Sequence, residues 1–101
     1  MIEKMKRRIL FVDDEPMVLN GLQRTLRKMR HDWDMTFVGS GREALDVLGK
    51  KPMDVIVSDL RMPEMDGGRL LAEVKNQHPQ VVRIILSGQL DQEMTLKSVQ
   101  L

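Results

Sequence analysis

The chain has 101 residues, the size of one modest domain, of which 42% are hydrophobic and 31% are charged. It holds no apolar run that could span a bilayer and no signal-peptide pattern, so we expect a soluble, cytoplasmic protein without membrane contact. The lack of cysteine excludes disulfides, thiolate catalysis and cysteine-based zinc sites. A net charge of +1 argues against a polyanion such as nucleic acid as the main partner.

The chain begins with the pattern of a strand followed by a helix. Residues 9–12 are apolar without alternation, which is typical of a strand buried on both faces of a parallel sheet. Apolar side chains then recur at helical spacing after a proline that suits a first helical turn, so we expect a helix over residues 16–30. These apolar residues are Val18, Leu22, Leu26 and Met29.

A second strand and helix follow. Residues 35–38 predict a weaker strand, and Ser40 and Glu43 have the capping-box spacing of a helix start. Residues 49–52 contain glycine and proline and should break this helix. The next apolar run, residues 55–57, is again typical of a buried strand.

The last part of the chain repeats the pattern. A third helix opens at residues 66–68 and should stop near His78, because Pro79 disfavours a helical residue before it. Residues 81–86 predict the fourth strand. Residues 89–99 predict a fourth helix.

Four strands that alternate with four helices predict an α/β domain, with a doubly wound parallel sheet and right-handed crossovers. We expect one domain over residues 1–101. Ligands of such folds bind at the carboxyl ends of the strands. Four polar side chains follow strands at that edge: Asp13, Asp14, Asp59 and Ser87.

Three carboxylates at one edge repel one another. A pair about 4 Å apart costs about 1 to 4 kcal/mol at effective dielectric constants of about 80 to 20. Oxygen ligands favour Mg²⁺, or Mn²⁺, as the compensating cation, with Asp14 and Asp59 as direct ligands and Asp13 holding a coordinated water. Each residue alone has an ordinary explanation, as an acid at a helix start, an acid in a turn or a serine at a strand end. The joint pattern favours the metal site.

Basic residues gather in two places, at residues 4–8 and near the end of the first expected helix. The second group consists of Arg24, Arg27, Lys28 and Arg30. Aromatic residues make up only 3% of the chain and no nucleic-acid-reading helix is recognisable. We therefore interpret both groups as solvated faces rather than as a direct nucleic-acid site.

Three segments together resemble the response-regulator receiver domain of bacterial two-component signalling. Residues 9–16 (ILFVDDEP) resemble its first strand and acidic pair, and residues 59–67 (DLRMPEMDG) resemble its phosphorylation segment. Residues 84–88 (IILSG) resemble its switch-hydroxyl segment. The resemblance runs from about residue 8 to the last residue and implies a flavodoxin-like fold.

The resemblance implies a role for each residue of the cluster. Asp59 would accept a phosphoryl group from a phosphohistidine on a sensor histidine kinase or phosphotransfer protein. Asp14, Asp59 and the backbone carbonyl of Arg61 would hold the metal, with Asp13 acting through water. Ser87 would contact the phosphoryl group and switch the conformation, to control an output domain that this chain does not include. Any catalysis would be limited to self-phosphorylation and autodephosphorylation.

The chain departs from the family pattern at its end. The family continues with a fifth strand and helix, so we interpret this chain as a truncated receiver with four strands and four helices. The family's catalytic lysine has no counterpart, because Lys97 would lie about 12 Å along the fourth helix. An exposed strand at residues 81–86 would favour self-association.

Two other functions stay open at this point. One is a receiver-like protein-binding module that works without phosphorylation; the missing lysine keeps it open, whereas the retained acids and Ser87 favour the phosphoacceptor. The other is a metal-dependent phosphohydrolase with an Asp nucleophile. That chemistry usually needs a second acid two residues after the nucleophile, where this chain has Arg61.

Overall fold

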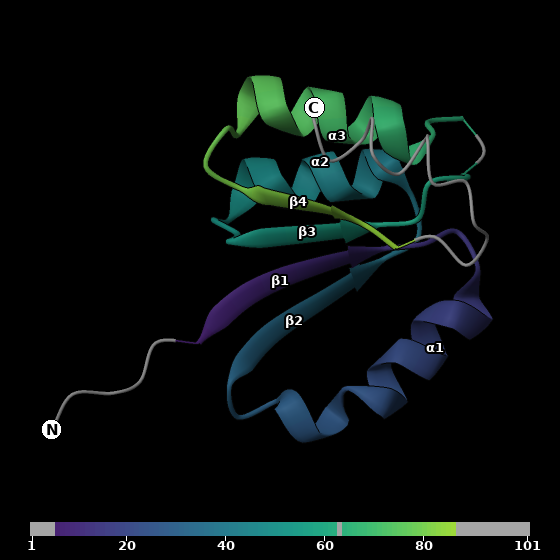
Figure 1. Cartoon of the computed structure of the whole chain (residues 1–101), viewed down its shortest axis with the longest axis vertical. Coiled ribbons are helices and arrows are strands. Elements are labelled where there is room, and N and C mark those ends of the chain that lie inside the picture. Colours follow the sequence, from purple (N-terminus) through teal and green to yellow (C-terminus); the bar gives the residue numbers. More distant parts are fainter. Residues whose placement is uncertain (1–5, 63, 87–101) are drawn as a thin grey trace, which may run out of the picture.

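The computed structural model describes residues 6–62 and 64–86, in which strands and helices alternate (Figure 1). The strands are β1 (Arg7–Val12), β2 (Trp33–Val38), β3 (Val55–Ser58) and β4 (Val82–Ile85). The helices are α1 (Pro16–Thr25), the short 3-10 helix η1 (Arg27–Met29), α2 (Gly41–Lys50) and α3 (Gly67–Gln77).

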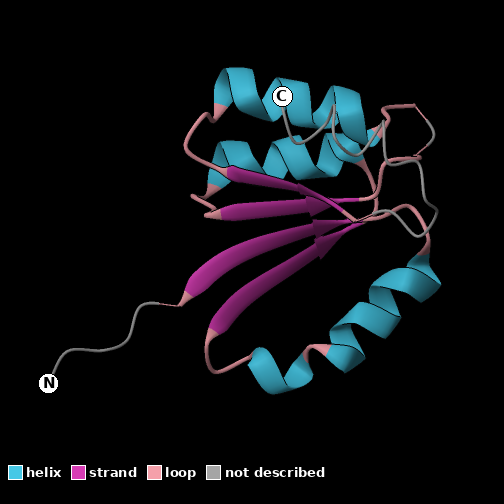
Figure 2. Ribbon diagram, viewed as in Figure 1, coloured by secondary structure: helices cyan, strands magenta, loops and turns pink. Residues whose placement is uncertain are grey.

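The four strands form one parallel sheet in the order β2-β1-β3-β4. Helices α2 and α3 cover one face, and α1 lies on the other (Figure 2). The doubly wound α/β fold expected from the sequence is confirmed. The expected fourth helix, residues 89–99, lies outside the described residues. Within the described part of the chain, no helix combines the length and apolar character needed to cross a membrane.

The main core lies between the sheet and the α2–α3 layer. Leu10 and Ile56 are partners in adjacent strands and are completely buried. They pack in one cluster with Ala44 of α2 and with Leu70 and Val74 of α3, each of which is also fully buried. Full burial of a large aliphatic side chain contributes about 1.5 to 3 kcal/mol, so this layer carries much of the stability.

The opposite face of the sheet is less completely covered. Helix α1 has no buried residue, although Phe11 beneath it is buried and stacks on Phe37 of β2 with ring centroids 4.9 Å apart. On β4, Val82 and Ile84 are 55% and 44% exposed. These residues are paired with Val55 and Val57 of β3, so they share their face of the sheet. Self-association through this strand stays a prediction, which the exposed side chains support.

Two helices begin as the local sequence indicates. At the start of α2, Ser40 Oγ accepts a hydrogen bond from the Glu43 N–H (3.1 Å), and the Glu43 carboxylate accepts one from the Gly39 N–H (2.8 Å). The first bond confirms the expected cap at Ser40, whereas the second reaches Gly39, one residue before the cap, and not the Ser40 N–H of a full capping box. At the start of α3, Asp66 Oδ1 accepts a hydrogen bond from the Arg69 N–H (2.8 Å).

One helix end differs from the expectation and another agrees with it. Helix α1 ends at Thr25 instead of near residue 30, because Leu26 leaves the α-helical backbone and the chain tightens into η1. Helix α2 ends within residues 49–52, as expected: it includes Gly49 and stops at Lys51, which is extended. The physical reason is that Lys51 precedes Pro52, and the proline ring disfavours the helical conformation of the residue before it.

An ion pair joins the beginnings of β1 and β3. Asp54 accepts hydrogen bonds from the Arg8 backbone N–H (2.8 Å), from Arg8 Nε (3.2 Å) and from Arg8 Nη2 (3.1 Å). These hydrogen bonds lower the pKa of Asp54. Because the folded-state pKa lies below the unfolded one, the pair stabilises the fold above the unfolded pKa. That stability is lost as the pH falls through the folded-state pKa.

We expect Asp54→Asn to lower the melting temperature at neutral pH, because the amide cannot form the charged pair. The difference from wild type should shrink once the pH falls below about 4, where the unfolded carboxyl is protonated. Thermal unfolding of both proteins, from neutral pH to below about pH 4, measures this difference in melting temperature. Asp46→Asn, at an exposed position of α2, is the control for removing one negative charge. A difference in melting temperature between wild type and Asp54→Asn that does not change with pH would contradict the role of the ion pair.

Candidate functional site

Three acidic side chains meet at the carboxyl edge of the sheet. Asp13 follows β1 and Asp59 follows β3, and the two strands are paired in parallel up to Val12 and Ser58. The Asp59 N–H donates to the Val12 carbonyl (3.0 Å), which extends the pairing past the strand end. One carboxylate oxygen from each of Asp13, Asp14 and Asp59 lies within 4.8 Å of the others. The structure therefore brings together the three acids that the sequence singled out.

Asp13 shows the electrostatic state of this cluster. Its side chain is buried, at 7% exposure, whereas Asp14 and Asp59 are half-buried. Burial raises the pKa of Asp13, and the charges of Asp59, Asp14 and Glu15 raise it further. The Glu15 N–H, which donates to Asp13 Oδ1 (2.9 Å), opposes this shift. The raised pKa means that the surroundings do not fully compensate the ionised carboxylate.

The donor set of the cluster fits a hard divalent cation. It offers three carboxylates, the ligands that Mg²⁺ and Mn²⁺ prefer, and no sulfur or imidazole. A cation among Asp13, Asp14 and Asp59 would also supply the positive charge that the raised pKa of Asp13 calls for.

The backbone around Asp59 is fixed by its neighbours. Ser58 Oγ donates to the Asp59 carbonyl (2.9 Å), and the Gly67 N–H donates to the Leu60 carbonyl (2.8 Å). A Cβ at Gly67 would collide with the Asp59 carbonyl oxygen and would lie 2.8 Å from Leu60 Cα. Glu64 has a φ of 66°, in the left-handed region, which costs a non-glycine residue about 1 to 2 kcal/mol. The start of α3 thus packs directly on the segment that carries Asp59.

The remaining residues named from the sequence have different outcomes. Arg61 lies two residues after Asp59, with an exposed side chain, and the role of its backbone carbonyl stays a prediction. Ser87 and Lys97 lie outside the described residues. Gly67 lies in the motif of residues 59–67, but the sequence reasoning gave it no role beyond the start of the third helix. A glycine there also fits an ordinary turn, so the need for a missing Cβ emerges only from the packing.

We expect Gly67→Ala to destabilise the fold by about 1 to 3 kcal/mol, the usual cost of overpacking, because the backbone of residues 59–60 must move. Gly68→Ala is the matched control. The nearest atom to a Cβ there is Asp66 Oδ1 at 3.4 Å, and alanine gains about 1 kcal/mol of helix propensity over glycine. Urea unfolding midpoints measure both variants. Equal stability of the two would contradict the close approach of α3 to residue 59.

Comparisons with known proteins agree with this geometry. The family model of the response regulator receiver domain matches residues 9–101. The hydrogenase transcriptional regulatory protein HoxA of Cupriavidus necator is 37% identical over 91 residues, which are 90% of this chain and 18% of HoxA. The transcriptional regulatory protein GlrR of Escherichia coli is 40% identical over 80 residues, which are 79% of this chain and 18% of GlrR.

Solved structures show the same fold. The signal receiver domain of an HD domain-containing protein from Pseudomonas fluorescens has a TM-score of 0.85 and 30% identity, covering 94% of this chain and 74% of that one. The chain spans less than a fifth of the length of HoxA and GlrR, so the similarity concerns one part of those longer proteins. With the family model matched over most of its length, the chain belongs to the response regulator receiver domain family.

Proposed function

We propose that the chain is a phosphoacceptor, in which Asp59 takes a phosphoryl group from a phosphohistidine of a sensor histidine kinase or phosphotransfer protein. The observation that carries this proposal is the gathering of Asp13, Asp14 and Asp59 within 4.8 Å in a member of the receiver family. A lone surface aspartate would lack the neighbours needed to hold a cation beside the incoming phosphate.

The acid cluster also defines the place of the metal in this proposal. Asp14, Asp59 and the backbone carbonyl of Arg61 would hold Mg²⁺, or Mn²⁺, and Asp13 would hold one of its waters. When bound, the cation would neutralise charge on the transferred phosphoryl group and position it in line with the attacking oxygen.

The chain itself supplies a nucleophile held in a fixed position. A carboxylate oxygen of Asp59 forms the new bond to phosphorus while the bond from phosphorus to the histidine nitrogen breaks, and the imidazole keeps that electron pair. Asp59 is well placed for this because its N–H and its carbonyl are both hydrogen-bonded, to Val12 and Ser58. Positioning of this kind supplies much of the rate in phosphoryl transfer.

Ser87 is proposed as the hydroxyl that hydrogen-bonds a phosphoryl oxygen and so couples phosphorylation to a change of conformation. The output would belong to a partner or to another part of a longer protein. Both HoxA and GlrR are transcriptional regulators of which this chain matches only 18%, and they support such an arrangement.

Asp13→Asn tests the electrostatic basis of the site. The amide keeps an acceptor for the Glu15 N–H but removes one buried charge, so without a divalent cation we expect a gain of about 1 kcal/mol in stability. Added Mg²⁺ should stabilise wild type and should stabilise the variant much less. Thermal unfolding with EDTA and with Mg²⁺ measures both effects. Equal stabilisation of wild type and Asp13→Asn by Mg²⁺ would mean that Asp13 does not contribute to the metal site.

Phosphorylation itself is tested with a small acyl-phosphate donor and Mg²⁺, followed by intact mass spectrometry. We expect one phosphoryl adduct on wild type, none on Asp59→Asn and none with EDTA. Asp66→Asn is the matched control, because asparagine also caps a helix and residue 66 lies outside the acid cluster. An equal adduct on Asp59→Asn, or no adduct on wild type, would overturn the proposal.

A further inference from the structure

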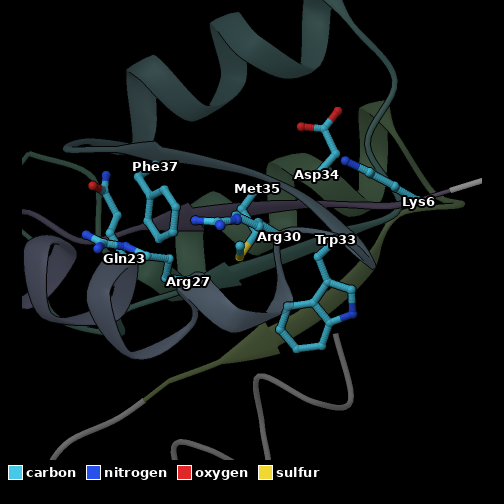
Figure 3. Close-up of a pocket in the computed structure, with 8 residues that line it drawn as sticks. All are labelled: Lys6, Gln23, Arg27, Arg30, Trp33, Asp34, Met35 and Phe37. Carbon is cyan, nitrogen blue, oxygen red and sulfur yellow. The ribbon is translucent and has the colours of Figure 1, made fainter.

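A groove runs between α1–η1 and β2, near the end of the sheet opposite the acid cluster (Figures 1 and 3). Its volume is about 450 Å³, and it is open to solvent along one side. The residues that line it are Lys6, Gln23, Arg27, Arg30, Trp33, Asp34, Met35 and Phe37. None of them belongs to the candidate phosphoryl site, so the groove has no role in the function proposed above.

The floor of the groove is largely apolar. Trp33, Met35 and Phe37 are alternate residues of β2, so their side chains share one face of the strand, and all three are half-buried. Phe37 stacks on Phe11 of the neighbouring strand with an angle of 9° between the rings. Asp34 falls between them in sequence and also lines the groove, with its carboxylate directed away from Trp33 (Figure 3). The apolar part of the floor therefore comes from Trp33, Met35 and Phe37.

The rim of the groove is basic. Arg27 and Arg30 are exposed, and a second hollow beside them adds Arg24, Lys28 and His31. In the part of the chain that the structure describes, the side-chain ion pair is the one between Arg8 and Asp54, so none of these cations forms a salt bridge with a described carboxylate. The guanidinium group of an exposed arginine can bind a carboxylate through two parallel hydrogen bonds.

The combination of floor and rim favours a protein partner. Tryptophan, phenylalanine, methionine and arginine are the residue types enriched in protein–protein contacts. β2 is also an edge strand of the described sheet, and an extended peptide can add to such an edge through its backbone. Single-stranded nucleic acid would need several aromatic platforms in a row, whereas the groove offers Trp33 and Phe37, and Phe37 already stacks on Phe11.

We propose that this groove binds an acidic, extended segment of a partner protein, in which carboxylates alternate with aliphatic or aromatic side chains. The apolar side chains would cover Trp33, Met35 and Phe37, and the carboxylates would pair with Arg27 and Arg30. Because the groove lies away from Asp59, this binding is independent of phosphorylation. Asp59→Asn should therefore bind the same segment as wild type does.

Trp33 provides a direct readout, since tryptophan fluorescence reports on this groove alone. The probe is a peptide of about ten residues in which Glu and Leu alternate, the length of a long strand. We expect a blue shift of Trp33 emission that saturates with peptide and weakens as salt is raised. Peptides that alternate Lys with Leu, or Glu with Ser, should bind more weakly by on the order of tenfold, because each lacks one of the two complementary features.

Charge reversal tests the rim. The double variant Arg27→Glu with Arg30→Glu should lose affinity for the Glu–Leu peptide by on the order of tenfold or more. The matched control is Arg42→Glu with Lys75→Glu, two exposed positions on α2 and α3 with the same change of net charge. Circular dichroism verifies the fold of each variant, and Arg27→Gln with Arg30→Gln, which should lose affinity in the same direction, is the milder second test.

Three outcomes would overturn the inference. The first is no change of Trp33 emission with the Glu–Leu peptide. The second is an equal loss of affinity in the control pair on α2 and α3, which would mean that net charge alone drives binding. The third is tighter binding of oligothymidylate of the same length than of the peptide, which would assign the groove to nucleic acid.

Discussion

The parallel pairing of β1 with β3 is the constraint on which the rest of this molecule depends. It places Asp13 and Asp59 side by side, one residue beyond the last pair of the two strands. Like charges resist this arrangement by about 1 to 4 kcal/mol for each close pair. The pairing holds because Leu10 and Ile56 lie opposite each other and are completely buried, and each contributes about 1.5 to 3 kcal/mol. The apolar core thus keeps in place a charge cluster that would otherwise separate.

The two faces of the sheet are covered to different extents. Against α2 and α3 the core is closed, and the packing is tight enough that Gly67 must lack a side chain for α3 to approach residue 59. On the other face, α1 buries none of its residues completely, and β4 exposes Val82 and Ile84. The closed face positions the chemistry, whereas the open face leaves apolar surface at β2 and β4 that another chain can contact.

Charge is separated along α1, although the net charge of the whole chain is only +1. The helix begins beside Asp13 and Asp14 and ends near Arg24 and Arg27. Acids near its first turn and bases near its last turn both complement the helix dipole, so each group is favoured where it lies. The proposed cation and phosphoryl group would bind at the acidic end, and the carboxylates of the proposed partner segment would bind at the basic end. The net charge of the whole chain gives no sign of this separation.

The sequence by itself determined the order of strands and helices, the helix cap at Ser40 and the acids that follow β1 and β3, because these depend on local periodicity and short-range hydrogen bonds. It also determined the family, through ordered motifs. Tertiary structure alone decided the exposure of α1, the need for glycine at position 67 and the alignment of Trp33 with Arg27 and Arg30 in one groove. These features depend on which surfaces meet when segments distant in the sequence pack together. Neither the type of a side chain nor its spacing along the chain predicts such contacts.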